Sequence, residues 1–166
     1  MLRASLPLPD ELMSRELILL RHAHANPAQA GAHDAERALS ARGVTEAEGA
    51  GAWLRGHAAL PALVLCSPAR RAGQTLEHAL GRIDSLVEPR IYEASAGELI
   101  DLVDEHAAVP RLLMVGHNPG FETLVALLTT GQSGDFRGMP PGGIAWIEFA
   151  GAVEPGAGRL KAFWAP

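Results

Sequence analysis

The sequence predicts a three-layer α/β/α sandwich, with a mostly parallel central sheet and an antiparallel hairpin at its C-terminal edge. Short apolar runs typical of buried strands alternate along the chain with longer helical patterns. The last third instead holds two apolar runs joined by a Gly- and Pro-rich turn. The whole chain has 166 residues, 48% of them hydrophobic, which is enough to form one full hydrophobic core. We expect a single domain over residues 16–166, after a loose extension over residues 1–15.

Continuous apolar runs indicate three strands that are buried on both faces. They lie at residues 17–20, Leu63–Cys66 and residues 112–115. A further short strand is expected over residues 87–92, despite Pro89. The edge hairpin is expected from Ile144–Phe149 and residues 160–164.

Helical patterns fill the segments between these strands. They cover residues 44–55, a segment from Ser67-Pro68 to Leu80, Ala96–Glu105, and a segment from Asn118-Pro119 to Leu128. Ser67 and Asn118 are each expected to cap a helix, because a proline suited to the first helical turn follows each of them. Gly81 is expected to end the second helix.

Charge and cysteine content exclude several functions. A formal net charge of -5 argues against nucleic-acid binding, which needs an excess of basic surface. Cys66 is the only cysteine, so neither an intramolecular disulfide nor a cysteine zinc cluster can form. No apolar run suffices to span a membrane, and residues 1–15 lack the continuous apolar core of a signal peptide. We expect a cytoplasmic monomer that binds neither nucleic acid nor membrane.

Each of the three buried strands ends in a polar cluster. The clusters are Arg21-His22, Ser67-Pro68-Ala69-Arg70-Arg71 and Gly116-His117-Asn118. Ligands of open parallel sheets bind beyond the carboxyl ends of the strands. If these strands are neighbours, two histidines, at least two arginines and two helix N-termini meet in one pocket.

Such a pocket suits an anion with several oxygens, because the planar fork of arginine matches phosphate. Arg71 lies in the first turn of an expected helix, where a cation opposes the helix dipole at a cost of about 0.3–1 kcal/mol. A bound anion would offset that cost; the alternative is a solvated surface arginine. Nearby cations would also keep His22 neutral and nucleophilic, although a histidine after a strand can equally be structural.

Three motifs in this order resemble those of the histidine phosphatase superfamily. They are Arg21-His22-Ala23, the segment from Ser67 to Thr75 in the form Ser-Pro-x-x-Arg-Ala-x-x-Thr, and Gly116-His117-Asn118-Pro119-Gly120. The third has the form typical of the short SixA-like branch, the phosphohistidine phosphatases. The spacing of Asp34, Arg37, Leu39 and Gly43 is also similar to that branch. The resemblance runs from about Leu17 to the final hairpin and implies a phosphoglycerate mutase-like fold.

The resemblance also implies roles for individual residues. His22 would take the phosphoryl group, and water would then hydrolyse the phosphohistidine and release inorganic phosphate. Arg21 and Arg71 would hold the phosphoryl oxygens, while His117 would stabilise their charge. No metal or other cofactor is expected, because these side chains supply the positive charge.

The general acid is the point at which this sequence departs from larger members of the superfamily. Those members carry a glutamate in the middle of the chain that protonates the leaving oxygen. Glu93 is the nearest candidate, but its surroundings differ from the acid motif and it could equally be solvated. Without an acid, imidazole leaves more readily than an alkoxide. This favours a phosphoprotein carrying phosphohistidine as the partner, with small phosphoesters as the alternative.

Other interpretations stay open at this stage. His22 and His24 could form a His-x-His metal pair, although the chain is short for such a metallohydrolase and the arginines would repel a cation. Asn26 could reach the phosphate, or could serve a turn beside Pro27. The chain could also be a phosphoprotein-binding module without turnover. A mutase is disfavoured, because a mutase must enclose its phosphorylated intermediate from water and this chain is short.

Overall fold

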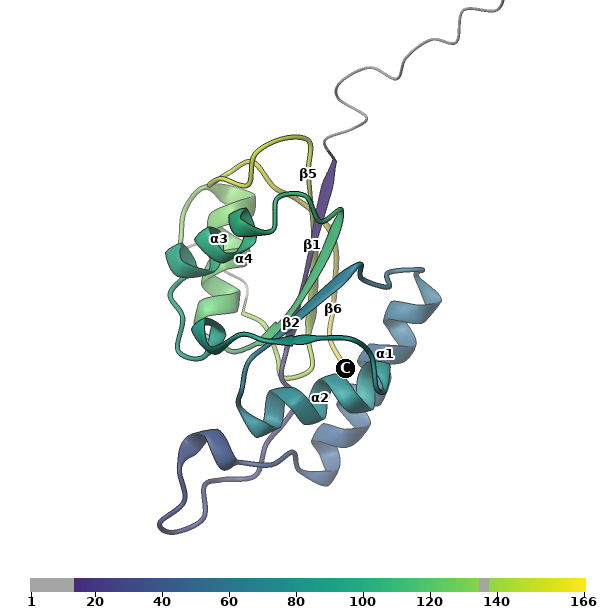
Figure 1. Ribbon diagram of the computed structural model, residues 1–166, viewed down its shortest axis with the longest axis vertical. Helices are drawn as coiled ribbons and strands as arrows, with labels where there is room; N and C mark the ends of the chain where they lie inside the picture. The colour runs from purple at the N-terminus through teal and green to yellow at the C-terminus, as the bar shows by residue number, and fades with distance from the viewer. Residues whose placement is uncertain (1–13, 135–137) are drawn as a thin grey trace, which may run out of the picture.

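The computed structural model describes residues 14–134 and 138–166. Within these residues one six-stranded sheet has the order β3-β2-β4-β1-β5-β6 (Figure 1). The strands are β1 (Arg15–Arg21), β2 (Leu63–Cys66), β3 (Leu86–Val87), β4 (Arg111–Gly116), β5 (Ile144–Phe149) and β6 (Arg159–Trp164). Strands β1 to β4 pair in parallel with one another. Strand β5 pairs antiparallel with β1, and β6 pairs antiparallel with β5. The predicted α/β fold, with its antiparallel C-terminal hairpin, is therefore confirmed.

Helices pack on both faces of this sheet (Figure 1). They are α1 (Ala41–Gly56), α2 (Arg70–Leu80), α3 (Ala96–Glu105) and α4 (Gly120–Thr130). Side chains of β1 alternate between the faces. Ile18 and Leu20 join the core formed with α1 and α2, while Leu17 and Leu19 join the core formed with α3 and α4. Over the described residues, no helix has the length and apolarity needed to cross a membrane.

Three expectations about element boundaries need correction. The strand expected at residues 87–92 is only the two residues of β3, followed by the short 3-10 helix η3 (Pro89–Ile91), because Pro89 has no N–H for a strand ladder. The first helix begins at Ala41, since the Ser40 hydroxyl caps it by accepting from the Gly43 N–H. Residues 1–13 of the expected N-terminal extension lie outside the described residues, and Arg15 already belongs to β1.

The two expected proline-associated caps also differ from the prediction. Ser67 does not cap α2, whose N-cap position is Ala69. The Ser67 hydroxyl instead accepts from the Ala69 N–H at 3.2 Å, before the helix begins. Asn118 is not the N-cap of α4 either, because that position is Pro119, but its Oδ1 accepts from the Glu122 N–H in the first helical turn at 3.2 Å. Gly81 ends α2 as expected, with a φ of 71° that favours glycine.

Gly51 allows α1 and α2 to approach closely, and its replacement by alanine should be strongly destabilising. A Cβ at Gly51 would lie 1.8 Å from the carbonyl oxygen of Ala79 on α2. We expect Gly51→Ala to lower the free energy of unfolding by about 1–3 kcal/mol or more, measured by chemical denaturation. Gly73→Ala is the matched control, because a Cβ there meets nothing within 4 Å and should add about 0.5–1 kcal/mol of helix stability. Equal effects of the two changes would contradict this prediction.

Candidate active site

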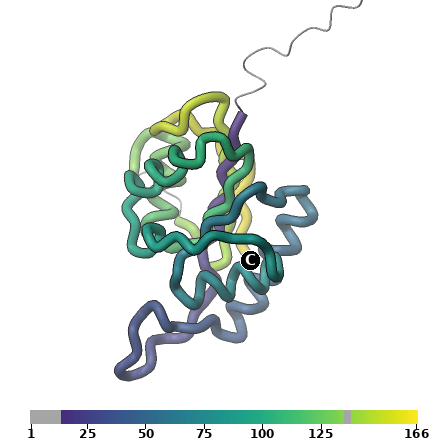
Figure 2. The backbone as a smooth tube through the Cα atoms, in the orientation of Figure 1, coloured from purple at the N-terminus to yellow at the C-terminus, as the bar shows by residue number. Residues whose placement is uncertain are grey.

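The three polar clusters lie at one edge of the sheet. β4 lies between β1 and β2, and the last paired residues are level: Arg21 with Gly116, and Cys66 with Val115. His22, Ser67 and His117 therefore leave the sheet side by side. The loop between β1 and α1 extends outward from this same edge (Figure 2). The neighbouring strands required by the sequence-based prediction are thus present.

Arg71 lies between the two histidines. Its Nε donates to Nε2 of His22 at 3.3 Å, and its Nη2 approaches Nδ1 of His117 at 3.4 Å. The two imidazole rings are 5.1 Å apart between centroids. Arg71 is only 6% exposed, so the alternative of a solvated surface arginine is wrong.

The hydrogen bonds of His22 define which ring nitrogen can act as a nucleophile. Nδ1 lies 2.8 Å from the carbonyl oxygen of Ala23, which can only accept, so Nδ1 carries the proton. Nε2 then holds the lone pair that faces Arg71. Burial lowers the pKa of His22 to about 4, and the charges of Arg71 and Arg21 act in the same direction. The ring is therefore neutral at pH 7.

His117 is held in a similar state by different partners. Burial lowers its pKa to about 3, with further contributions from His22 and Arg71. Because Arg71 can only donate, Nδ1 of His117 is the acceptor and Nε2 carries the proton towards the Ser67 hydroxyl at 2.7 Å. Ser67 thus orients a site histidine, a role that the sequence pattern, which indicated a helix cap, did not reveal.

The depressed pKa values of the two rings predict acid lability. Unfolded histidine has a pKa near 6.5, so the unfolded chain binds protons at these positions below about pH 6.5. In the folded protein the pKa is about 4 for His22 and about 3 for His117, so the folded rings bind protons only at lower pH. Stability present above pH 6.5 is therefore lost as the pH falls through this window. The slope should be on the order of 1 kcal/mol per pH unit for each ring. Urea denaturation of wild type and His117→Asn at pH 7 and 5 checks this, and an equally steep loss in both would contradict it.

Thr75 fixes His22 relative to Arg71. Its hydroxyl accepts from the Ala23 N–H at 3.0 Å and donates to the Arg71 carbonyl oxygen at 2.7 Å. Thr75 is fully buried and lies one helical turn after Arg71, so the four-residue spacing in the second motif has a direct structural reason. That spacing was the signal from which this supporting contact could have been inferred.

Arg21 supplies a second positive charge that acts on both rings. Its Nη1 donates to the Met139 carbonyl oxygen at 2.7 Å. Its Nε is buried and has no hydrogen-bond partner among the described residues. The charge of Arg21 contributes to lowering the pKa of both His22 and His117. Four predicted residues, Arg21, His22, Arg71 and His117, therefore form one cationic cluster.

Comparison with known proteins agrees with this arrangement. The sequence profile of the histidine phosphatase superfamily (branch 1) matches residues 17–111. The chain belongs to this superfamily. An uncharacterized protein of Mycobacterium tuberculosis is 37% identical over 149 residues, which cover 82% of this chain and 93% of that protein.

Solved structures of the superfamily share the fold over most of the chain. SixA of Agrobacterium tumefaciens is similar with a TM-score of 0.79 and 29% identity, covering 92% of this chain and 99% of that one. The protein histidine phosphatase SixA in complex with tungstate is similar with a TM-score of 0.77 and 26% identity, covering 91% and 97%.

Glu93 lies near the cationic cluster without joining it. It lines a cavity of about 500 Å³ that also borders Arg71, His117 and Asp34. Its backbone has a φ of 59°, the left-handed region that non-glycine residues rarely adopt. Its role as the general acid of this superfamily member stays a prediction.

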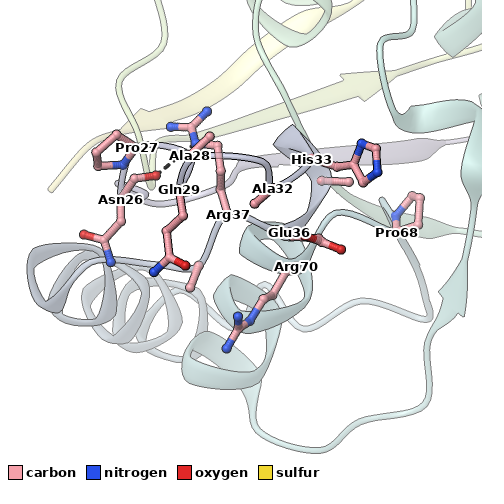
Figure 3. A pocket seen from close by; sticks show the side chains of 12 residues that line it. Asn26, Pro27, Ala28, Gln29, Ala32, His33, Glu36, Arg37, Pro68 and Arg70 are labelled. Carbon is pink, nitrogen blue, oxygen red and sulfur yellow. Dashed lines mark hydrogen bonds between the residues drawn. The ribbon is translucent and has the colours of Figure 1, made fainter.

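Asn26 and His24 contact other parts of the loop between β1 and α1. The Asn26 amide donates to the Leu39 carbonyl oxygen at 3.3 Å, and Asn26 lines a separate cavity of about 470 Å³ (Figure 3). Its contact with phosphate stays a prediction. Nδ1 of His24 lies 2.7 Å from the hydroxyl of Ser40, the N-cap residue of α1.

Across residues 14–134 and 138–166, no group of three or more His, Cys, Asp and Glu side chains could hold a metal ion.

Proposed function

We propose that the chain is a phosphatase that needs no metal, forms a phosphohistidine intermediate on His22, and acts on phosphohistidine in proteins. One observation carries this proposal: Nε2 of a neutral His22, the ring nitrogen with the lone pair, accepts from Arg71 Nε at 3.3 Å, and the His117 ring lies 5.1 Å away between centroids. A neutral imidazole is the form that can attack phosphorus. Guanidinium and imidazole groups already in place around it stabilise the charge of the transferring group.

The reaction proceeds in two displacements. Nε2 of His22 forms a bond to phosphorus while the bond to the leaving nitrogen breaks, and that nitrogen retains the electron pair. Arg71, Arg21 and His117 hold the phosphoryl oxygens; binding this dianion raises the pKa of His117, so its protonated ring donates to an oxygen. Water then attacks phosphorus, the bond to Nε2 breaks, and inorganic phosphate leaves.

Two considerations support phosphohistidine as the substrate. A leaving imidazole needs less protonation than an alkoxide. Glu93 lines the cavity beside Arg71 and His117 but, among the described residues, has no hydrogen bond to either of them. SixA, similar over more than nine-tenths of this chain, is described as a protein histidine phosphatase, and its complex holds tungstate, a tetrahedral oxyanion like phosphate. Both favour a phosphorylated protein over a sugar or alcohol phosphate.

Phosphate release from a histidine-phosphorylated protein, compared with p-nitrophenyl phosphate, tests this function. In the presence of EDTA we expect turnover of both, with kcat/KM for the phosphoprotein at least about 100-fold higher. Loss of activity with EDTA would contradict the metal-independent reaction. Comparable values for the two substrates would favour a broad phosphomonoesterase, and tight phosphoprotein binding without release would favour a binding module.

A further inference from the structure

Asp34 occupies one edge of the Arg71 guanidinium. Nη1 of Arg71 donates to the Asp34 carbonyl oxygen at 2.9 Å, and Nη2 donates to Asp34 Oδ2 at 3.0 Å. The other edge, formed by Nε and Nη2, faces His22 and His117. A guanidinium has donors along two edges, each of which can bind two oxygens. Asp34 thus binds the guanidinium edge formed by Nη1 and Nη2, while the edge formed by Nε and Nη2 faces the two histidines.

Asp34 is itself held from two other directions. The Tyr92 hydroxyl donates to Asp34 Oδ2 at 2.7 Å, and Nη1 of Arg37 donates to Oδ1 at 3.1 Å. These donors and Arg71 hold the pKa of the Asp34 carboxyl well below its usual range, so it is ionised at neutral pH. The Tyr92 ring also packs edge-on against His117, with centroids 5.5 Å apart. Three segments distant in sequence therefore meet at one carboxylate.

We infer that Asp34 is a positioning residue for Arg71, which it holds so that the Nε and Nη2 edge faces the phosphoryl group, and that Tyr92 acts through Asp34. This inference rests on the proposed function only in naming a phosphoryl group as the anion. The Asp34 side chain is 50% exposed while that of Arg71 is 7% exposed, so the carboxylate reaches inward from the mouth of the site. Arg71 has no other carboxylate partner among the described residues.

The direction in which phosphate affinity changes when Asp34 is neutralised distinguishes a positioning role from a simple charge effect. A carboxylate near an anion site repels the anion, so if Asp34 acted through its charge alone, its neutralisation would strengthen phosphate binding. If Asp34 positions Arg71, the same change releases the guanidinium and weakens phosphate binding. The two roles therefore predict opposite changes in one measured quantity.

Asp34→Asn tests the inference, with Glu36→Gln as the matched control. Glu36 is exposed and lies on the same short 3-10 helix, η2 (Asp34–Glu36). Glu36→Gln removes one negative charge, as Asp34→Asn does. We expect Asp34→Asn to weaken the affinity for inorganic phosphate, measured by calorimetry, and to lower kcat/KM, each by about 10-fold or more. Glu36→Gln should stay near wild type. Phosphate affinity of Asp34→Asn that is unchanged or stronger than wild type would overturn the inference.

Tyr92→Phe supplies a second test that does not depend on the carboxylate change. It should weaken phosphate binding in the same direction but less, because Arg37 still holds Asp34. In the double variant with Asp34→Asn the effect should not exceed that of Asp34→Asn alone, since Tyr92 acts through that carboxylate. Additive effects would overturn the inferred chain of contacts. Phosphate binding is measurable without turnover, so absence of phosphatase activity in wild type would refute the proposed function and leave this test intact.

Discussion

His22→Asn is expected to lower phosphate release by more than about 10³-fold, because it removes the nucleophile itself. The shorter asparagine side chain ends near the position of Nδ1, so it has no atom that could replace the lone pair on Nε2. Its amide N–H can still donate to the Ala23 carbonyl oxygen, which now lies 2.8 Å from Nδ1, so this contact of the site should persist. Rapid-quench reactions followed by intact-mass measurement check the chemistry: wild type should gain one phosphoryl group that is lost in acid, and the variant should gain none.

His24→Asn is the matched control for this change. His24 is the same residue type, two positions further along the loop, and its ring contacts Ser40 rather than Arg71. The nucleophile hypothesis predicts near wild-type turnover for this variant. A metal bound by a His-x-His pair would instead require both rings. Comparable losses in the two variants, together with sensitivity to EDTA, would therefore contradict a phosphohistidine at His22.

The convergence of His22, Arg71 and His117 could be predicted from the sequence for a simple physical reason. Each follows a continuous apolar run, such runs form buried parallel strands, and parallel strands share one carboxyl edge. What the pattern left open was whether the strands are neighbours. The structure answers this with β4 between β1 and β2, level at their ends.

The contacts of Asp34 and Tyr92 were harder to predict, because both residues lie outside the main helices and strands. The partners of Arg71 and His117 include Asp34, in a polar loop, and Tyr92, at the end of a segment predicted as a strand, and the two lie 58 residues apart. Ser67 carried a misleading signal, since a serine before proline is also typical of a helix cap. Only the spacing of Asp34 after the first motif, similar to that of the SixA-like branch, singled it out, and spacing does not specify a partner.

Arg71→Lys is expected to reduce kcat by about 10²–10³-fold even though it keeps the positive charge. One ammonium cannot occupy the positions of Nε, Nη1 and Nη2, which now contact His22, Asp34 and His117. Burial is the largest cause of the low pKa of His22, so the acid limb of the activity profile should move little while kcat falls. That combination distinguishes loss of geometry from loss of charge.

Arg70→Lys is the control for the Arg71 change. Arg70 is the preceding residue, lies in the same first turn of α2 and is exposed, so it offers the same substitution outside the cationic cluster. It should retain wild-type kcat and KM. If Arg71→Lys were equally active, a point charge at this position would suffice. The phosphoryl group would then not need two donors in a fixed plane, and the hold of Asp34 on the guanidinium would have no catalytic consequence.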